Sequence, residues 1–135
     1  MLKAELITKK YGQLSVLKGV DIEINKGEIV SIAGSSGAGK STLLHILGTL
    51  DSADSGSVWL NNERIDLLKG KKLAGFRNTH IGFVFQFHHL LPEFSALENV
   101  SIPGWIAGRK KKEISERATD LLTRLGLHDR LHNKP

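Results

Sequence analysis

The loop at residues 34–41, GSSGAGKS, constrains the fold of this 135-residue chain more than any other stretch. The Ile and Val residues at 28–33 before it predict a short buried strand, and the leucines at 41–47 after it predict an apolar helix. A loop with almost no side chains contributes little packing and loses much conformational entropy on folding. A role other than packing must therefore explain why it joins this strand to this helix.

The loop has the pattern G-x-x-x-x-G-K-[ST], in which Lys40 and Ser41 occupy the last two positions. Glycines let successive backbone N–H groups turn toward a phosphate, and the start of a helix adds free N–H groups and a positive dipole end. A lysine places a charge on the outer phosphates, and a hydroxyl suits Mg²⁺. The alternative, a structural glycine-rich turn, does not explain why strand, spacing, lysine and hydroxyl occur together. We therefore predict a triphosphate cradle.

The composition fits a soluble globular protein, with 40% hydrophobic and 24% charged residues. A chain of this length fits one domain. The absence of cysteine excludes disulfides and thiolate metal sites. Since no apolar run approaches the roughly 18 residues that a membrane span needs, we expect any work at a membrane to depend on a partner.

The net charge of +5 comes mainly from residues 100–135, which carry eight Lys and Arg against four Asp and Glu. The basic run RKKK at 109–112 lies at its centre. A solvated helix start explains such a run, and contact with anionic lipid or nucleic acid is the alternative. No aromatic residues are interleaved with the run, which disfavours the nucleic-acid interpretation, and no nucleic-acid partner is expected.

The hydrophobic pattern predicts a chain that is mostly β at the front and mostly α at the back. Alternation and turn residues indicate further strands at residues 2–8, 20–24, 57–60 and 63–65, the last two as a hairpin. An apolar run at 81–85 predicts another buried strand, which ends at Gln86. Helical spacing predicts a helix over 113–125 with one core-facing stripe, formed by Ile114, Ala118, Leu121, Leu122 and Leu125.

A P-loop alone is compatible with small-molecule kinases, GTPases, motors and transport ATPases. Three stretches narrow this choice: KKYG at 9–12, LKGVDIEINKGEIVSIAGSSGAGKSTLLHILGTLDSADSGSV at 17–58, and IGFVFQFHHLLPEFSALENV at 81–100. With them the chain resembles the nucleotide-binding subunits of ABC transporters over nearly its whole length. Within that family it is most similar to the lipoprotein-releasing (LolD-type) subgroup, chiefly through QFHHLLPEFSALENV. The macrolide-export and cell-division branches are close to this subgroup.

The resemblance implies an α/β fold, a P-loop NTPase with an incomplete RecA-like core. It implies that residues 1–135 form the N-terminal part of one ATP-binding domain. Residues 1–86 are then a β-rich antiparallel subdomain plus the P-loop core, and residues 87–135 are the start of a helical subdomain. The family's L-S-G-G-Q signature and its second strand ending in Asp-Glu do not occur in the chain. We therefore expect the chain alone to be inactive in hydrolysis and marginally stable.

The resemblance also assigns roles to matching residues. Tyr11 is expected to stack on adenine and Val16 to line the adenine and ribose, although a strand-end tyrosine and a core valine are the plain alternatives. Gln86 is expected to reach Mg²⁺ and the attacking water, where the alternative is an ordinary polar strand end. Lys40 and Gln86 are then the catalytic residues, and Ser41 and Gln86 the metal ligands. The implied phosphate cradle is Ser36, Gly37, Ala38, Gly39, Lys40, Ser41 and Thr42.

For the intact protein, the resemblance implies an ATP hydrolase that uses ATP and Mg²⁺ to power transport, with lipoprotein release as the expected process. It implies a homodimer at the cytoplasmic face of the bacterial inner membrane, attached peripherally to transmembrane permease subunits. Their docking site is expected on the apolar loop that contains Phe87, Leu90, Leu91, Pro92 and Phe94. A macrolide-export or cell-division subunit, a soluble ABC-type ATPase acting on DNA or the ribosome, and a P-loop kinase are the alternatives.

Overall fold

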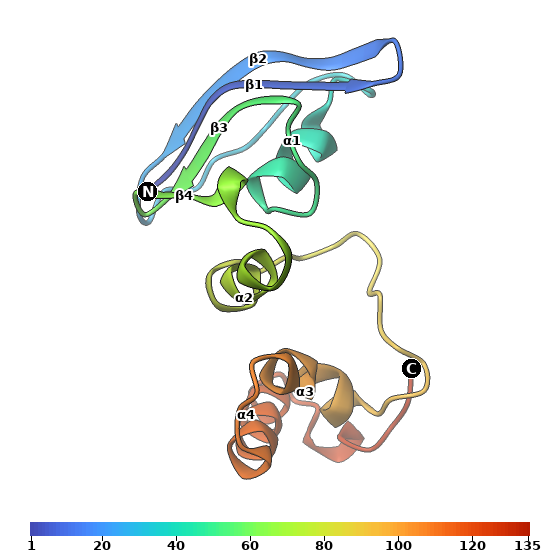
Figure 1. Cartoon of the computed structure of the whole chain (residues 1–135). Coiled ribbons are helices and arrows are strands. Elements are labelled where there is room, and N and C mark those ends of the chain that lie inside the picture. The colour runs from blue at the N-terminus through green and yellow to red at the C-terminus, as the bar shows by residue number, and fades with distance from the viewer. The chain divides into compact units, whose positions relative to one another are not determined.

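The structure, a computed structural model, describes all 135 residues. The chain forms two compact units, Met1–Ile81 and Gly82–Pro135 (Figure 1). The first contains the sheet, the P-loop and the helices α1 and α2, and the second contains the helices α3 and α4. Whether the functional subdomains divide at residue 86, as the sequence predicts, stays a prediction.

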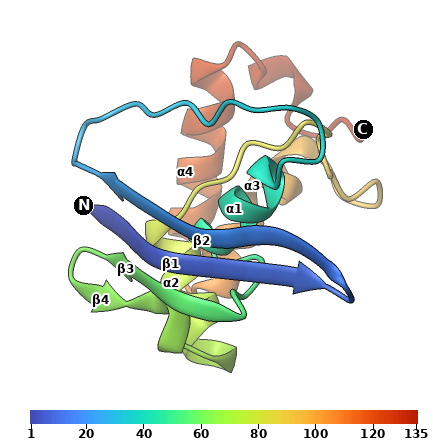
Figure 2. The same cartoon turned by 90° about the horizontal axis from the view of Figure 1, so that it is seen from above.

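The first unit is built on an antiparallel sheet with the strand order β2-β1-β3-β4. Figure 2 shows its long β1–β2 ribbon from above, with β3 beside β1. Tyr11 pairs with Leu14 across the turn, so only two residues connect these strands. The strands predicted at the front of the chain are confirmed, and β2 begins earlier than expected. Their bounds are Leu2–Tyr11 (β1), Leu14–Ile24 (β2), Ser55–Leu60 (β3) and Glu63–Arg64 (β4).

The core of the first unit lies between this sheet and two helices, α1 (Lys40–Leu47) and α2 (Gly70–His80). The three buried residues of α1 lie on one face at helical spacing, and α2 contributes its only buried residue. Each buried aliphatic or aromatic side chain stabilises the fold by about 1.5–3 kcal/mol. The buried cluster is Ala4, Ile7, Leu17, Leu43, Ile46, Leu47, Val58, Ile65 and Phe76. The helix predicted after the P-loop is confirmed, whereas α2 was not predicted.

A bulge in β1 changes which side chains face the core. The register with β2 shifts between Ala4 and Ile7, and Leu6 in between has a φ of +51°. One extra residue in a strand reverses the alternation beyond it. Ala4 is therefore buried before the bulge, while Ile7 and Lys9 are buried after it.

Two strands that the sequence predicts do not form. Residues 28–33 and 81–85 have no ladder hydrogen bonds, and Ile29 and Val84 are 99% and 100% exposed. A strand requires a neighbour that accepts and donates its backbone hydrogen bonds. No other segment of the described chain pairs with these two runs, so both expectations of a buried strand are wrong for this structure.

The second unit is a pair of packed helices, α3 (Ala96–Ile106) and α4 (Lys111–Arg124). They approach closely, because a Cβ built on Gly104 would lie 2.8 Å from Cγ1 of Ile114. Ser95 and Glu98 form a capping box at the start of α3. Neither helix is long and apolar enough to cross a bilayer, and the same holds for α1 and α2.

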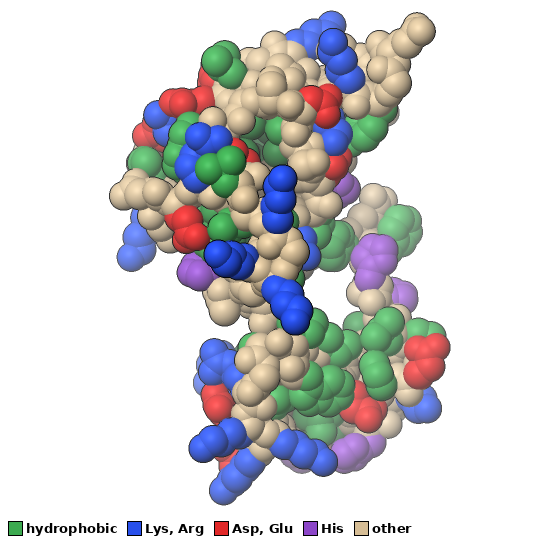
Figure 3. Space-filling view, in the orientation of Figure 1, with side chains coloured by type: hydrophobic (Ala, Val, Ile, Leu, Met, Phe, Trp, Pro, Cys, Tyr) green, Lys and Arg blue, Asp and Glu red, His purple; other side chains and the backbone are tan.

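The predicted helix at 113–125 is confirmed as α4, but its buried stripe is narrower than predicted. Ile114, Ala118 and Leu122 are buried, whereas Leu121 and Leu125 are 37% and 75% exposed. The reason is that α4 packs mainly against α3, with a smaller contact to the short 3-10 helix at His128–Arg130. Figure 3 accordingly shows hydrophobic side chains on the surface of the second unit, with Lys and Arg side chains at its margin.

Candidate nucleotide-binding site

The N-terminus of α1 presents free backbone donors to the P-loop. The N-cap, Gly39, has a left-handed φ of +84°, and no side chain caps the helix. Within α1, the first backbone amide that has a backbone acceptor is that of Leu43, which donates to the carbonyl oxygen of Gly39 at 2.8 Å. The amides of Lys40, Ser41 and Thr42 precede it without an intrahelical partner. Three N–H groups and the positive end of the helix dipole therefore face the loop.

Gly39 also lets the loop lie directly against β2. A Cβ at this position would lie 2.8 Å from Cγ1 of Val16, 2.9 Å from Cδ2 of Leu17 and 3.2 Å from the carbonyl oxygen of Val16. The first two distances are shorter than real Cβ atoms show, and a positive φ is itself unfavourable for residues with a Cβ. The close packing of the loop on the sheet therefore depends on glycine here.

The loop encloses a pocket of about 330 Å³ that all seven predicted cradle residues line together with Val16. The volume is at the low end of the range for ligand pockets, and the pocket is open to solvent. Gly39 is the only buried residue among those lining it. The residues at the pocket are Val16, Ser36, Gly37, Ala38, Gly39, Lys40, Ser41 and Thr42.

The Lys40 ammonium lies across this loop. Its Nζ donates to the carbonyl oxygens of Gly34 at 2.9 Å and Ser35 at 2.6 Å. Both acceptors are neutral, and a phosphate oxygen is the stronger acceptor because it is charged. The exposed Ser41 hydroxyl beside it offers the oxygen that Mg²⁺ prefers. The donors and the oxygen ligand of this pocket therefore fit a magnesium triphosphate.

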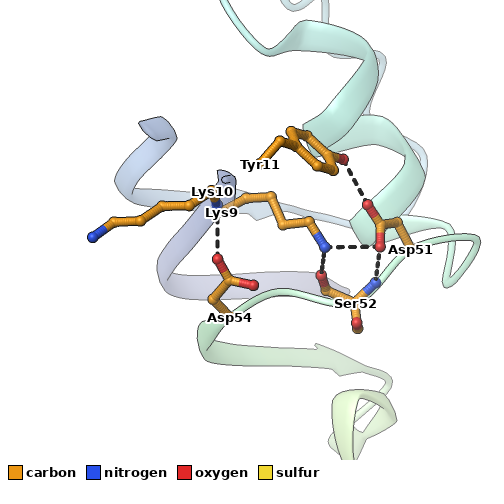
Figure 4. A network of polar contacts seen from close by, with 6 residues as sticks. All are labelled: Lys9, Lys10, Tyr11, Asp51, Ser52 and Asp54. Carbon is orange, nitrogen blue, oxygen red and sulfur yellow. Dashed lines mark hydrogen bonds and ion pairs between the residues drawn. The ribbon is translucent and has the colours of Figure 1, made fainter. Parts of the chain in front are cut away.

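Tyr11, at the end of β1, belongs to a network of polar contacts that also contains Lys9 and Asp51 (Figure 4). The Tyr11 hydroxyl donates to Oδ2 of Asp51 at 2.7 Å, and Lys9 Nζ donates to Oδ1 at 2.9 Å. Lys9 also donates to the carbonyl oxygen of Ser52 at 2.6 Å. Its ammonium lies 5.3 Å from the centroid of the Tyr11 ring. The ring is half exposed, which leaves surface for a ligand.

The contacts within this network fix its protonation at neutral pH. The hydrogen bond to Asp51 raises the pKa of the Tyr11 phenol, and the nearby Thr42 hydroxyl opposes that shift. Hydrogen bonds from Lys9 and Tyr11 hold the pKa of Asp51 below its usual value, and Asp51 raises the pKa of Lys9. Lys9 is therefore cationic, Asp51 anionic and Tyr11 a neutral donor. Because Thr42 belongs to α1, Tyr11 lies beside the P-loop helix.

The sequence profile of the ABC transporter family matches residues 17–135. The chain belongs to the ABC transporter family. It is 60% identical to the lipoprotein-releasing system ATP-binding protein LolD of Bacteroides thetaiotaomicron and 50% identical to that of Aquifex aeolicus. Both matches cover the whole chain, which spans 62% and 60% of the length of those two proteins. The predicted resemblance to the LolD-type subgroup of the ABC family is confirmed.

Solved structures of ABC cassettes share the fold. One is a dimeric ATP-binding cassette in a post-hydrolysis state bound to ADP and phosphate, with a TM-score of 0.86 and 40% identity. Another is a dimeric bacterial ABC transporter cassette, with a TM-score of 0.89 and 38% identity. Each match covers all of this chain and 62% of the solved chain. The predicted fold class, an incomplete P-loop NTPase core, is confirmed as that of an ABC cassette.

Gln86 belongs to the second unit of this ABC chain, and it is not among the residues that line the P-loop pocket. It is exposed and belongs to the irregular segment before α3. Its approach to the P-loop and to Mg²⁺ stays a prediction. No group of three His, Cys, Asp or Glu side chains lies where it could share a metal ion.

The segment that follows Gln86 combines an exposed apolar surface with an anchored end. Phe87, Leu90 and Leu91 are 68%, 46% and 44% exposed. The Asn99 side chain accepts from the Leu91 amide at 2.9 Å and donates to the carbonyl oxygen of Phe94 at 3.1 Å. The exposed apolar residues are therefore presented on a loop that α3 holds at its far end.

Lys9 and Asp51 are site residues that sequence reasoning missed. One signal was present, because Lys9 is two residues from Tyr11, and residues at that spacing share one face of a strand. A lysine on a buried face needs an acidic partner. The bulge at Leu6 hid the signal, since a regular strand through Ala4 places Lys9 on the opposite face.

Proposed function

We propose that the chain provides the nucleotide-binding part of an ABC ATPase subunit and binds Mg-ATP through its P-loop. The pocket formed by residues 36–42 carries this proposal, since it combines free α1 amides with the Lys40 ammonium. Lys40 binds the outer phosphates and Ser41 ligates Mg²⁺. Tyr11 stacks on the adenine, and Val16 lines the base and the ribose at the edge of the same pocket.

In the intact protein this site serves ATP hydrolysis. Bound Mg²⁺ supplies neutralisation of the phosphate charge. Lys40 stabilises negative charge on the transferred phosphoryl group, and Gln86 orients the attacking water through its amide and also ligates Mg²⁺. The 135 residues alone supply positioning groups but no second acidic strand end. We expect them to bind Mg-ATP and to release no phosphate above background in a phosphate assay.

The transport process we propose is lipoprotein release, the process named for the relatives at 47–60% identity. The subunit then pairs with a second copy, as the related cassettes do in their dimeric structures. It lies at the cytoplasmic face of the bacterial inner membrane, where the exposed segment with Phe87, Leu90 and Leu91 docks on the permease subunits.

Calorimetric titration with a non-hydrolysable Mg-ATP analogue tests the nucleotide site. We expect Lys40→Ala to weaken binding by about tenfold or more, since a hydrogen bond from a charged donor contributes about 1.5–3 kcal/mol. The matched control is Lys72→Ala, which removes an exposed lysine of the same unit that does not line the pocket. Equal affinities of the two variants would refute the proposed site.

Purification from native membranes tests the docking proposal. We expect the complete protein to retain permease subunits, and the pair Phe87→Ser and Leu91→Ser to lose them while still binding ATP. Since both side chains are exposed, these changes leave the core intact. Co-purification of nucleic acid in place of membrane subunits would favour the soluble ABC-type ATPase instead.

A further inference from the structure

The Lys9–Asp51 ion pair, in which the lysine is buried and the carboxylate is partly exposed, is a feature that the proposed function leaves unexplained. Lys9 is only 7% exposed, and removing a charge from water is unfavourable unless its partners compensate closely. Buried ion pairs are often no more stabilising than apolar side chains of the same volume. A role in holding something in one orientation explains the pair better than stability does.

The geometry around Asp51 shows what is held. Its Oδ1 accepts from Lys9 Nζ at 2.9 Å and from the Ser52 amide at 2.7 Å. The carboxylate is thereby fixed in one orientation, with Oδ2 toward the Tyr11 hydroxyl at 2.7 Å (Figure 4). Lys9 also faces the Tyr11 ring. The tyrosine is thus held at its hydroxyl and covered on one face, which leaves the other face for a flat ligand.

The same contacts tie Tyr11 to the helix that starts at the P-loop. Asp51 follows the C-terminus of α1, which ends at Leu47, and Thr42 in the first turn of α1 also influences Tyr11. The Tyr11 hydroxyl is therefore bonded to the segment that follows the helix whose N-terminus forms the phosphate pocket. This arrangement fixes the separation between a base-stacking surface and a triphosphate site.

We propose that Asp51, itself oriented by Lys9, is a positioning residue that holds the Tyr11 ring for stacking on the adenine of a P-loop-bound nucleotide. This inference rests on the proposed nucleotide-binding function and deepens it. It makes adenine affinity separable from phosphate affinity. Loss of the Asp51 contact should weaken the binding of ligands that carry the adenine base, and it should leave the affinity for base-free triphosphate unchanged.

The variant Tyr11→Phe isolates the contact, because it keeps the ring and removes only the hydroxyl that Asp51 accepts from. We measure calorimetric affinities for Mg-ATP and for magnesium tripolyphosphate. Tyr11→Phe should weaken the binding of Mg-ATP by about threefold to tenfold, which corresponds to part of the free energy of one hydrogen bond to a charged group. Tyr11→Ala should weaken it further, since base stacking is lost as well. Tripolyphosphate should bind all three proteins within about twofold.

The outcomes separate the two proposals. If Tyr11→Ala binds Mg-ATP as tightly as the wild type, Tyr11 does not stack on the base, and that part of the proposed function fails. If Tyr11→Ala weakens Mg-ATP but Tyr11→Phe does not, positioning through Asp51 is overturned while stacking stands. If Tyr11→Phe weakens the binding of tripolyphosphate as much as that of ATP, the hydroxyl has a general structural role, and positioning through Asp51 is also overturned.

A spectroscopic titration tests the contact without any ligand. Tyr11 is the only tyrosine, so the ultraviolet absorbance of phenolate reports on this group alone. Asp51→Asn should lower the midpoint toward the ordinary tyrosine value of about 10. The matched control Asp54→Asn removes a neighbouring carboxylate that accepts from the Lys10 amide at 2.7 Å and should leave the midpoint unchanged. An unshifted midpoint in Asp51→Asn would overturn the inference. If Asp51→Asn does not fold, the comparison of Tyr11→Phe with Tyr11→Ala decides.

Discussion

Replacement of Gly39 by alanine is the sharpest test of how the P-loop is built. The new Cβ would lie 2.8 Å from Cγ1 of Val16 and 2.9 Å from Cδ2 of Leu17, at a residue with a φ of +84°. Two penalties therefore act together, one from the backbone conformation and one from overpacking against β2. Both fall on the segment that presents the α1 amides to the phosphate pocket.

The expected loss of folding free energy in Gly39→Ala can be estimated by comparison with a second glycine. Gly27 has nearly the same φ, +82°, but nothing lies within 4 Å of a Cβ built there. Gly27→Ala should therefore cost only the left-handed conformation, about 1–2 kcal/mol. Gly39→Ala should add overpacking of about 1–3 kcal/mol. The entropic effect on the unfolded chain is the same for both substitutions and cancels in the comparison.

Urea unfolding followed by tryptophan emission measures the difference. Trp59 lies in β3 of the first unit and Trp105 in α3 of the second, so a Trp105→Phe background reports on the first unit alone. Gly39→Ala should unfold at a lower urea concentration than Gly27→Ala and should bind Mg-ATP at least about tenfold more weakly. Equal unfolding midpoints for the two variants would refute the close approach of the loop to β2.

Three further predictions concern other parts of the chain. Ser95→Ala removes the N-cap of α3 and should lower the unfolding free energy of the second unit by about 1 kcal/mol, read from Trp105 emission; an unchanged midpoint would contradict the capping box. Gly104→Ala should destabilise the α3–α4 contact by about 1–3 kcal/mol, and adding Ile114→Ala should relieve part of that loss; strict additivity would contradict the contact. Asp51 has a lowered pKa when folded, so its stabilisation should hold above about pH 4 and disappear as the pH falls further. Lys9 and Tyr11 have raised pKa values, so their contributions should hold below about pH 10 and disappear above it. If the wild type remains more stable to unfolding than Asp51→Asn at low pH, that result would contradict the network.

The sequence predicted the parts of the site whose chemistry is local. The P-loop pattern places glycines, Lys40 and Ser41 within a few residues of one helix start, and the pocket lining follows that spacing. The strand β1 and the C-terminal half of β2 were also predictable from their alternating patterns, whereas the N-terminal half of β2 was not. In each case the partner groups lie close in the chain.

The sequence did not predict what depends on distant partners. Residues 28–33 have the hydrophobic pattern of a buried strand but form none. Such a pattern indicates only that a segment tends to be buried, and it does not indicate whether another strand is available to pair with it. The bond from Lys9 to Asp51 joins residues 42 positions apart, and the bulge at Leu6 decides that Lys9 faces inward. No local pattern contains that information.

Amide chemical shifts of the isotopically labelled chain test the central claim, that the P-loop binds the phosphates, most directly. Addition of a non-hydrolysable Mg-ATP analogue should shift the amide signals of residues 36–42 and of Tyr11. Magnesium tripolyphosphate should shift the signals of residues 36–42 and leave that of Tyr11 in place. Shifts that leave residues 36–42 unchanged with both ligands would contradict the account.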